Sequence, residues 1–518
     1  MPITPLEPAR ILQPGLTLKP DAEALVSLRA RWTWRALDEA SSRLAGSYLE
    51  MGLKPGDPVA SLMPNRSELM LHYLACLKAG LVATPLNYRY RMLEVDHALQ
   101  VSDARILLVH DERREELAQS RLVGALPLGT IGYSDDWMDS EGPFADLVKR
   151  PLQRDLPAPP ADAPAVIFFT SGSTGPAKGV THSHRTLGWN CASVIQGYAL
   201  TADDVTLPGS FISHIGGYLT SLAALGAGAR VLEARRFDPG EILPLIREER
   251  PTVLSMVPVA LFELVLEPGI TKADLASTRL FVAGGDKTVH QLYQAFMELA
   301  PVPVAESYGM TEIGFATVNR SNDLAFEGSV GQAMPGYAFD IRDDGGRPVP
   351  VGQPGNLWVK SPGTTLGYWN DAAATAQVLQ DGWFDTGDLL RVDETGFYWF
   401  HGRKKQIIVH DASNICPQEV EEALLDHPSV AKSGVVGVHD LVHGENVQAY
   451  VSLHPGAEVP RASDLIAFAR ERVGYKAPEE VVILDDLPLN PTGKVDRVTL
   501  KRMAADQHKA GHQEDHTV

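Results

Sequence analysis

A segment rich in glycine and hydroxyl residues, 169–179, carries the clearest chemical signal in this 518-residue chain. It reads FTSGSTGPAKG and directly follows the apolar run 166–168. Glycines let backbone N–H groups turn toward a ligand, hydroxyl groups add donors, and Lys178 supplies positive charge. The combination suits an anion with several oxygens, above all a triphosphate. It is not a Walker A motif, because Ala177 rather than glycine precedes Lys178.

Four more segments could complete a nucleotide site. The segment 306–312 (ESYGMTE) offers a ring that can stack on a base, a threonine for phosphate and a carboxylate for Mg²⁺. The segment 382–388 ends in Asp388, whose carboxylate could accept both hydroxyls of a ribose. The segment 402–405 (GRKK) is basic, and 488–494 (PLNPTGK) is a turn that presents Lys494. Each segment alone can be an ordinary turn or solvated surface; their order and joint occurrence favour a function.

Composition narrows the class of protein. The net charge is −19, from 46 basic and 65 acidic residues, which argues against non-specific binding to nucleic acid or anionic lipid. Three cysteines in so long a chain provide neither a disulfide framework nor metal-ligand spacing. The first 20 residues contain five prolines and no continuous apolar core, and no apolar run approaches the ~20 residues of a membrane span. We therefore expect a soluble, cytoplasmic protein.

The elements needed to position these residues follow an alternating pattern. A helix is predicted over 67–79, ended by Gly80 and followed by a short buried strand. Further strands are predicted at 104–110, 230–232, 253–256 and 280–283. This alternation indicates an α/β architecture with parallel sheets. A β-rich unit is expected over 328–400, a smaller region to about 505, and a disordered tail in which His508, His512 and His516 form no metal site.

The five motifs, in this order, resemble those of the adenylate-forming superfamily, which includes acyl-CoA synthetases, peptide-synthetase adenylation domains and firefly luciferase. The resemblance covers about 24–500. It implies a multidomain α/β protein with a large N-terminal AMP-binding domain over 1–402, made of two α/β subdomains and a β-barrel at about 328–402. A small mobile α+β domain over 403–505 would follow a hinge near Gln406, and 506–518 would be the disordered tail.

The resemblance also implies roles for individual residues. Thr311 would contact the α-phosphate of ATP, and Glu312 would hold Mg²⁺. Asp388, assisted by Arg403, would bind the ribose hydroxyls. Lys494 would reach in from the small domain and neutralise charge as the carboxylate substrate attacks the α-phosphate. The β- and γ-phosphates would be held by Thr170, Ser171, Gly172, Ser173, Thr174, Gly175 and Lys178, and the adenine pocket would comprise Gly284, Gly285, Asp286, Glu306, Ser307 and the stacking ring of Tyr308.

An acyl pocket is implied beside this nucleotide site. His214 lies in the family segment that often carries a histidine or aromatic residue next to the acyl group, and we expect a catalytic role for it. No arginine or lysine falls at the pocket positions, which disfavours a second carboxylate on the substrate, although Lys287 nearby keeps it possible. The remaining positions are apolar, aromatic or small, as an apolar fatty or aromatic mono-carboxylate requires: Phe211, Tyr218, Met256, Val257, Gly309, Met310 and Gly314.

The implied activity is that of an ATP- and Mg²⁺-dependent carboxylate ligase, which forms an acyl-adenylate and pyrophosphate and then transfers the acyl group with release of AMP. CoA is the expected acceptor; an amine or a carrier-protein thiol is the alternative. The sequence departs from the family at the hinge, where Gln406 stands for aspartate, and at His410, Asp411 and Ala412, where the family usually has Ser-Gly-Gly. Those glycines line the pantetheine channel of CoA ligases, so their loss keeps an amine acceptor open.

Two other classes of protein are alternatives to the ligase. A luciferase-like oxygenase would emit light from an adenylated substrate. A non-enzymatic nucleotide-binding protein is disfavoured because Lys178, Glu312 and Lys494 are all present. We expect small-molecule partners only, no nucleic acid, and a monomer or homodimer.

Overall fold

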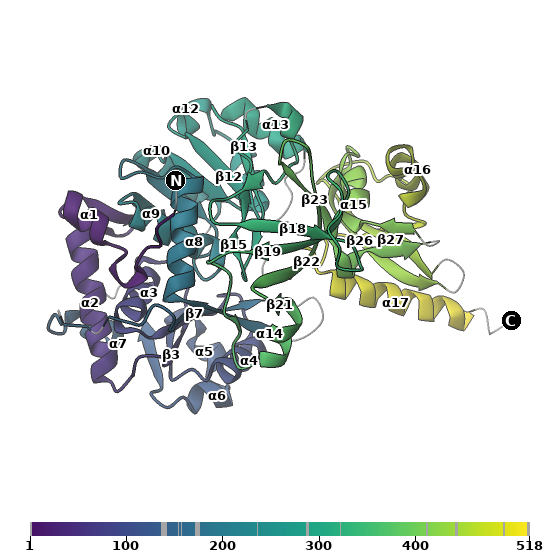
Figure 1. The fold of residues 1–518 in the computed structure, drawn as a ribbon. Helices are drawn as coiled ribbons and strands as arrows, with labels where there is room; N and C mark the ends of the chain where they lie inside the picture. The colour runs from purple at the N-terminus through teal and green to yellow at the C-terminus, as the bar shows by residue number, and fades with distance from the viewer. Residues whose placement is uncertain are drawn as a thin grey trace. The chain divides into compact units, whose positions relative to one another are not determined.

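The computed structural model describes residues 3–514 apart from 136–141, 154, 157, 171–176, 236, 286–289, 322, 411–412, 441–443 and 491–492. The chain forms two compact units (Figure 1). Unit 1 comprises Met1–Phe339, Trp358–Asp385 and Gly396–Tyr398, and unit 2 comprises Asp340–Leu357, Thr386–Thr395 and Trp399–Val518. The division predicted between 402 and 403 stays a prediction.

The first sheet of unit 1, sheet A, has seven strands in the order β13-β12-β11-β9-β10-β1-β2. All neighbours except the antiparallel pair β1–β2 run parallel. The residues of β11 are all buried, as expected of a parallel strand covered on both faces. The strands are β1 (Glu23–Ser27), β2 (Arg31–Thr33), β9 (Val205–Gly209), β10 (Arg230–Glu233), β11 (Val253–Met256), β12 (Leu280–Gly284) and β13 (Val304–Ser307).

The second sheet, sheet B, has the order β20-β8-β7-β4-β3-β5-β6. Its pairs from β7 through β6 are parallel, whereas β7–β8 and β8–β20 are antiparallel. The two sheets confirm the predicted α/β class. The strands are β3 (Pro58–Leu62), β4 (Val82–Pro85), β5 (Ile106–His110), β6 (Thr130–Tyr133), β7 (Pro164–Thr170), β8 (Lys178–Ser183) and β20 (Gly367–Tyr368).

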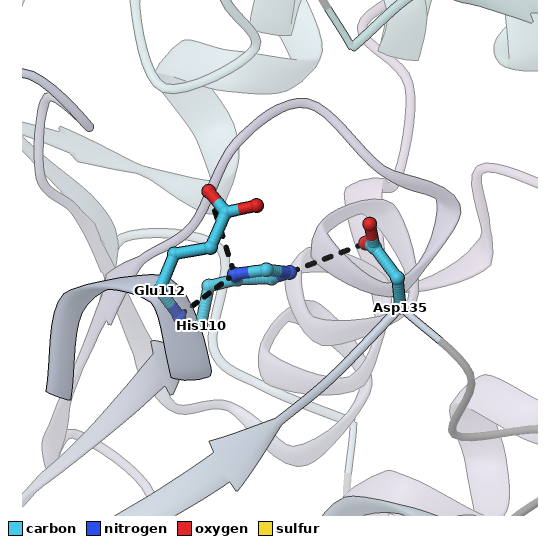
Figure 2. Close-up of side chains that lie close together, drawn as sticks. All are labelled: His110, Glu112 and Asp135. Carbon is cyan, nitrogen blue, oxygen red and sulfur yellow. Dashed lines mark hydrogen bonds and ion pairs between the residues drawn. The ribbon is translucent and has the colours of Figure 1, made fainter.

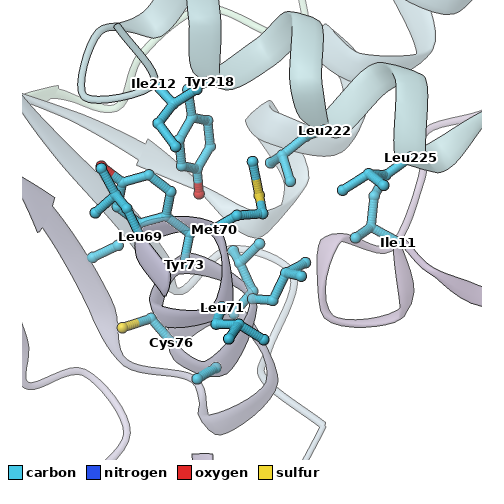
Figure 3. Close-up of a cluster of buried hydrophobic side chains, with 14 of the residues drawn as sticks. Ile11, Leu69, Met70, Leu71, Tyr73, Cys76, Ile212, Tyr218, Leu222 and Leu225 are labelled. Atoms are coloured by element: carbon cyan, nitrogen blue, oxygen red, sulfur yellow. The ribbon is translucent and has the colours of Figure 1, made fainter. Parts of the chain in front are cut away.

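Helices α3 (Ser67–Ala79) and α9 (Ile215–Gly226) pack side chains into one large core (Figure 3). Helix α3 has the predicted bounds, and Gly80 ends it in the left-handed conformation at φ 68°. The rings of Tyr73 and Tyr218 meet edge to face at 5.0 Å. The other helices of unit 1 are α1 (Gln13–Leu18), α2 (Trp34–Glu50), α4 (Met92–Ser102), α5 (Arg114–Leu117), α6 (Arg121–Gly124), α7 (Pro143–Lys149), α8 (His184–Gly197), α10 (Pro239–Glu249), α11 (Pro258–Val265), α12 (Lys272–Leu275), α13 (His290–Leu299) and α14 (Ala372–Val378).

Short strands follow sheet A along the chain. Two hairpins, β14–β15 and β16–β17, precede a five-stranded sheet of order β18-β19-β22-β21, in which β23 also pairs with β22. This sheet lies in the region for which the sequence predicts a β-barrel; closure into a barrel stays a prediction. The strands are β14 (Gly309–Met310), β15 (Gly314–Phe315), β16 (Thr317–Val318), β17 (Gln332–Ala333), β18 (Ala338–Arg342), β19 (Gly355–Lys360), β21 (Leu379–Gln380), β22 (Trp383–Val392) and β23 (Tyr398–Arg403).

The C-terminal part of unit 2 is an α+β fold. Its sheet has the order β25-β24-β27-β26, with β28 pairing in parallel with β27, and its core contains Val435, Val447 and Leu465. The elements are β24 (Ile408–His410), β25 (Ser413–Ile415), α15 (Pro417–Leu425), β26 (Val430–Asp440), β27 (Gly444–Leu453), α16 (Ala462–Val473), β28 (Glu480–Ile483) and α17 (Arg497–Glu514).

Helix α17 extends into the segment predicted as a disordered tail, because its described part continues to Glu514. The residues after 503 include alanine, glutamine, lysine and glutamate, which favour helix intrinsically, and they contain no proline. Among the described residues, every helix is too short or too polar to span a bilayer.

Candidate active site

The glycine-rich segment connects two antiparallel strands. Thr170 ends β7 and stands opposite Lys178, which begins β8, so these two antiparallel strands form a hairpin. Ser171, Gly172, Ser173, Thr174 and Gly175 lie outside the described residues. The exposed Lys178 places its Nζ 4.8 Å from the ring centroid of Tyr368. The hairpin thus presents an ammonium group where the sequence predicts a phosphate ligand.

The Thr311–Glu312 pair forms the turn between β14 and β15, where close packing demands glycine on both sides. A Cβ on Gly309 would lie 2.2 Å from the carbonyl oxygen of Gly314. Gly314 has φ 73°, and a Cβ there would lie 2.7 Å from Oδ1 of Asn190. A backbone clash at Gly309, and the positive φ and the Asn190 side chain at Gly314, therefore account for both glycines, and their predicted contact with substrate stays a prediction.

Two side chains from sheet B bind this turn. The hydroxyl of Tyr368 donates to Oε1 of Glu312 at 3.1 Å, and Nε2–H of His182 donates to the carbonyl oxygen of Thr311 at 2.8 Å. Burial lowers the pKa of His182 to about 4, although the bond to Thr311 acts in the opposite direction. The imidazole is therefore neutral near pH 7. Glu312 is itself only 7% exposed.

Sequence reasoning missed His182 and Tyr368. Both occur in short strands, β8 and β20, and no local pattern indicates that these strands pair with each other across nearly 190 residues. The one local signal near Tyr368 is the preceding glycine, Gly367. Its φ is 120°, and a Cβ on Gly367 would lie 2.4 Å from Cγ2 of Thr375, so this position requires glycine.

The predicted adenine residues lie where strands of sheet A end. Gly284 stands opposite Ser307 at the carboxyl ends of β12 and β13, and Gly285 follows with φ 90°. Ser307 donates through Oγ to the carbonyl oxygen of Thr317 at 2.7 Å, and the N–H of Tyr308 donates to Thr317 Oγ1 at 3.2 Å. The carbonyl oxygen of the neighbouring Glu306 accepts from the N–H of Asn319 at 2.7 Å. Ligands bind at this edge in open parallel sheets; Asp286 lies outside the described residues.

The predicted acyl residues follow two other strands of sheet A. After β9, the ring of Phe211 lies 6.3 Å from that of His214 and 5.2 Å from that of Phe237. Nε2 of His214 accepts a hydrogen bond from Nδ2 of Asn87 at 3.3 Å. The guanidinium of Arg89 lies over the Phe211 ring at 5.4 Å, so a basic group stands beside an aromatic residue of the predicted pocket. Sequence reasoning missed Arg89, because it follows a strand of the other sheet.

The other predicted acyl residues are less exposed. Met256 is 2% exposed, and Tyr218 is fully buried against Tyr73 and Phe168. Figure 3 shows Tyr218 inside the core that α3 and α9 share. Core packing accounts for Tyr218, and its predicted substrate contact has the weakest structural support. Val257 and Met310 are half-buried.

Unit 2 holds the remaining predicted residues. Nε of Arg403 lies 3.2 Å from Oδ1 of the buried Asp388, as expected for a partner that orients this carboxylate. Lys494 is exposed beyond Gly493 (φ 85°), and its N–H donates to Oδ1 of Asn490 at 3.1 Å. These contacts present the Lys494 side chain to solvent on a tight turn.

The altered hinge segment has partners of its own within unit 2. Oε1 of Gln406 accepts from Nε2 of Gln418 at 3.4 Å. His410 contacts the carbonyl oxygen of Glu445 through Nδ1 at 2.8 Å and the Glu479 carboxylate through Nε2 at 3.4 Å. Asp411 and Ala412 lie outside the described residues.

One group of possible metal ligands occurs in the described part of the chain: His110, Glu112 and Asp135 (Figure 2). Nε2 of His110 lies 3.2 Å from Oδ1 of Asp135. Arginines already occupy both carboxylates: Arg66 binds Asp135 at 2.8 Å, and Arg235 binds Glu112. Burial raises the pKa of Glu112 and Asp135, but Arg235 and Arg66 outweigh it and lower both values. A divalent cation would have to displace these guanidinium groups, so we interpret the group as an ion-pair network.

Comparison with known proteins shows the class of this enzyme, the AMP-forming ligases. The model of the AMP-binding enzyme family matches residues 15–369, and that of the AMP-binding enzyme C-terminal domain matches 419–494. The chain therefore belongs to the AMP-binding enzyme family.

Three relatives illustrate this similarity. Feruloyl-CoA synthase from Amycolatopsis sp is 34% identical over 94% of this chain and 96% of its own. ATP-bound MatB from Rhodopseudomonas palustris is 29% identical and superposes with a TM-score of 0.88 over 96% of this chain and 98% of its own. The amide bond synthetase McbA from Marinactinospora thermotolerans is 29% identical, with a TM-score of 0.85 over 96% and 99%.

Proposed function

We propose that this protein activates an apolar carboxylic acid with ATP, forming an acyl-adenylate and pyrophosphate, and transfers the acyl group to CoA with release of AMP. The observation that carries the proposal is the contact chain Lys178–Tyr368–Glu312. In this chain of contacts, the Lys178 ammonium, a predicted phosphate ligand, and the Glu312 carboxylate, a predicted metal ligand, both contact the same tyrosine. A triphosphate with its metal ion requires both groups close together.

The first half-reaction is an in-line displacement at the α-phosphate. A carboxylate oxygen of the acid attacks phosphorus, and the bond to the pyrophosphate oxygen breaks. The protein needs to position the two substrates and stabilise charge, without a covalent enzyme intermediate. Thr311 would contact the α-phosphate, Asp388 and Arg403 the ribose, and Lys494 the charge that develops during attack.

The donor set at the Thr311–Glu312 turn fits Mg²⁺, which prefers oxygen ligands from one or two carboxylates together with substrate phosphates. Glu312 would hold the ion, and the bound ion would neutralise phosphate charge. Tyr368 and His182 orient the turn from which Glu312 projects.

The substrate class follows from the surroundings of His214. Phe211, Phe237 and His214 form a group of rings, which suits an aromatic or fatty acyl group. Similarity to a feruloyl-CoA synthase favours the aromatic class. The Nδ2–H of Asn87 fixes the orientation of the His214 ring beside Phe211.

Carboxylate-dependent exchange of pyrophosphate into ATP tests the first half-reaction. We expect exchange with aromatic or fatty acids and a loss of at least about 100-fold in Lys494→Ala, because one charge that stabilises the transition state is removed. Lys432→Ala is the matched control, since Lys432 is also an exposed lysine of unit 2, and it pairs with Asp486 at 2.8 Å. Undiminished exchange in Lys494→Ala would exclude the role proposed for this lysine.

An amine is the second candidate acceptor, and the hinge segment favours it. His410 occupies a position where the resemblance implies a small residue, and its ring is held by two contacts. Similarity to an amide bond synthetase supports the same alternative. Mass spectrometry of reactions that contain the acid, ATP, CoA and a mixture of amines distinguishes a thioester from an amide product. A thioester alone would exclude the amine.

A further inference from the structure

We propose that Tyr368 is a positioning residue for Mg·ATP: its hydroxyl orients the Glu312 carboxylate and its ring locates the Lys178 ammonium. The inference rests on the proposed function and assigns a role to a residue that the sequence motifs do not include.

The first step is the fixed position of Tyr368. Its backbone pairs with Val180 of β8, two residues beyond Lys178. The N–H of Tyr368 donates to Thr375 Oγ1 at 2.9 Å at the start of α14, and its carbonyl oxygen accepts from the N–H of Asp371 at 3.1 Å. Strand pairing on one side and a helix start on the other therefore hold the residue, so its ring is placed before any ligand binds.

The second step concerns the hydroxyl. It donates to Oε1 of Glu312 at 3.1 Å. A phenol carries one O–H donor and no charge near pH 7. A neutral donor fixes the direction of a carboxylate without cancelling its charge. Mg²⁺ tolerates little deviation from octahedral geometry, so a fixed carboxylate lowers the cost of binding it.

The third step concerns the ring. The Nζ of Lys178 lies 4.8 Å from the ring centroid, within the range of a cation–π contact. The ring limits the positions of a long, exposed side chain that must meet phosphate oxygens. Tyr368 thus contacts both the proposed phosphate ligand, Lys178 of β8, and the proposed metal ligand, Glu312 of the β14–β15 turn.

Equilibrium binding tests the proposal without relying on turnover. The titrants are ATP with excess Mg²⁺ and ATP with EDTA, measured by calorimetry on the full-length chain. In Tyr368→Phe the ring remains but the hydroxyl is lost: we expect about tenfold weaker binding of Mg·ATP and unchanged binding of metal-free ATP. In Tyr368→Leu the ring is lost as well, and we expect metal-free ATP to bind several-fold more weakly too.

Tyr88→Phe is the matched control, because Tyr88 is also a half-buried tyrosine that donates to a glutamate, Glu112, at 2.6 Å. It should leave both affinities unchanged. Thermal unfolding checks that each variant is folded. The double variant Tyr368→Phe/Glu312→Gln should bind Mg·ATP no more weakly than Glu312→Gln alone. Additive losses of affinity would overturn the proposal, because Tyr368 would then act independently of Glu312.

Two further outcomes separate this proposal from the proposed function. If the wild-type protein binds Mg·ATP but Tyr368→Phe keeps the wild-type preference for Mg·ATP over metal-free ATP, the role of Tyr368 is excluded and the ligase function stands. If the wild-type protein binds no Mg·ATP, both fail.

Discussion

Two polar clusters connect sheets A and B of unit 1, and they use different chemistry. In the network around His110, carboxylates that follow β5 and β6 of sheet B meet Arg235 and Arg29, which follow β10 and β1 of sheet A. At the Glu312 turn, which follows sheet A, the groups that reach across from sheet B are the phenol of Tyr368 and the imidazole of His182.

The difference distinguishes the ion-pair network around His110 from the proposed cation site at Glu312. In both clusters a tyrosine hydroxyl donates a hydrogen bond to a glutamate carboxylate. The oxygen–oxygen distance is 2.6 Å for Tyr88 and Glu112 and 3.1 Å for Tyr368 and Glu312. Guanidinium partners neutralise Glu112 and lower its pKa, against the effect of burial. The two donors that Tyr368 and His182 provide to the Glu312 turn are neutral instead. Whether a group of acidic residues can bind a metal ion thus depends more on the hydrogen-bond and ion-pair partners of its carboxylates than on the number of acidic residues.

The sharpest test exchanges each glutamate for its neutral isostere. Glu312→Gln should lower kcat/KM for Mg·ATP in pyrophosphate exchange roughly 10²–10³-fold, because an amide brings no charge to the metal ion. Glu112→Gln should leave this value within about twofold and lower the free energy of unfolding by about 1 kcal/mol. Exchange assays and urea unfolding of both variants measure the contrast. Comparable losses of exchange would remove the distinction between the clusters.

The pH dependence of stability should separate the clusters next. The pKa of His182 is about 4 when folded and about 6.5 when unfolded, so the unfolded chain binds the proton first. As pH falls from about 6.5 to about 4, His182 should reduce the free energy of unfolding by up to about 3 kcal/mol. The pKa values of Glu112 and Asp135 are lowered in the folded protein. These carboxylates therefore stabilise the folded state at pH values above their unfolded pKa, and this contribution is lost only as pH falls below about 4.5.

The measurement is urea unfolding between pH 7 and pH 4. His182→Gln should flatten the wild-type curve between pH 6.5 and 4, whereas Glu112→Gln should lower the curve evenly above about pH 4.5 and change its slope only at the acid end. A wild-type curve parallel to that of His182→Gln would show that His182 titrates alike in both states.

Removing the His182 donor should have a smaller effect on catalysis. His182→Ala leaves the carbonyl oxygen of Thr311 without this donor at the predicted phosphate contact, and we expect exchange to fall about tenfold. His182→Gln, whose amide can still donate, should recover part of this loss. If both variants lose activity equally, the ring fills space rather than positioning Thr311.

The sequence predicted those parts of the fold that local patterns determine. Helix α3 has the predicted bounds because Gly80 ends it, and β11 has the bounds of its apolar run. Arg403 forms an ion pair with Asp388, and the ribose contact expected of both residues stays a prediction. Helix α17 continues beyond the expected start of the tail because good helix formers follow its buried part.

The supporting residues could not be predicted because they depend on contacts distant in the sequence. The pairing of β20 with β8 brings Tyr368 to Glu312. Arg89 follows β4 of sheet B and Phe211 follows β9 of sheet A, so their contact depends on how the two sheets pack. For Gly309 and Gly314, the motif indicates a site, whereas the structure shows that a Cβ on Gly309 would clash with backbone and that Gly314 has a positive φ and lies against the Asn190 side chain.

The smallest predicted effect concerns the outermost pair of the His110 network. The side chain of Arg29 is 61% exposed and lies 3.4 Å from Asp135, so water and salt screen the pair. Arg29→Ala should change the free energy of unfolding by less than about 0.5 kcal/mol at 0.1 M salt, less still at 1 M, with Mg·ATP binding unaltered. Urea unfolding at both salt concentrations measures the change. A loss above about 1.5 kcal/mol would mean that the connection between the sheets depends on this exposed pair rather than on the more buried Arg66 and Arg235.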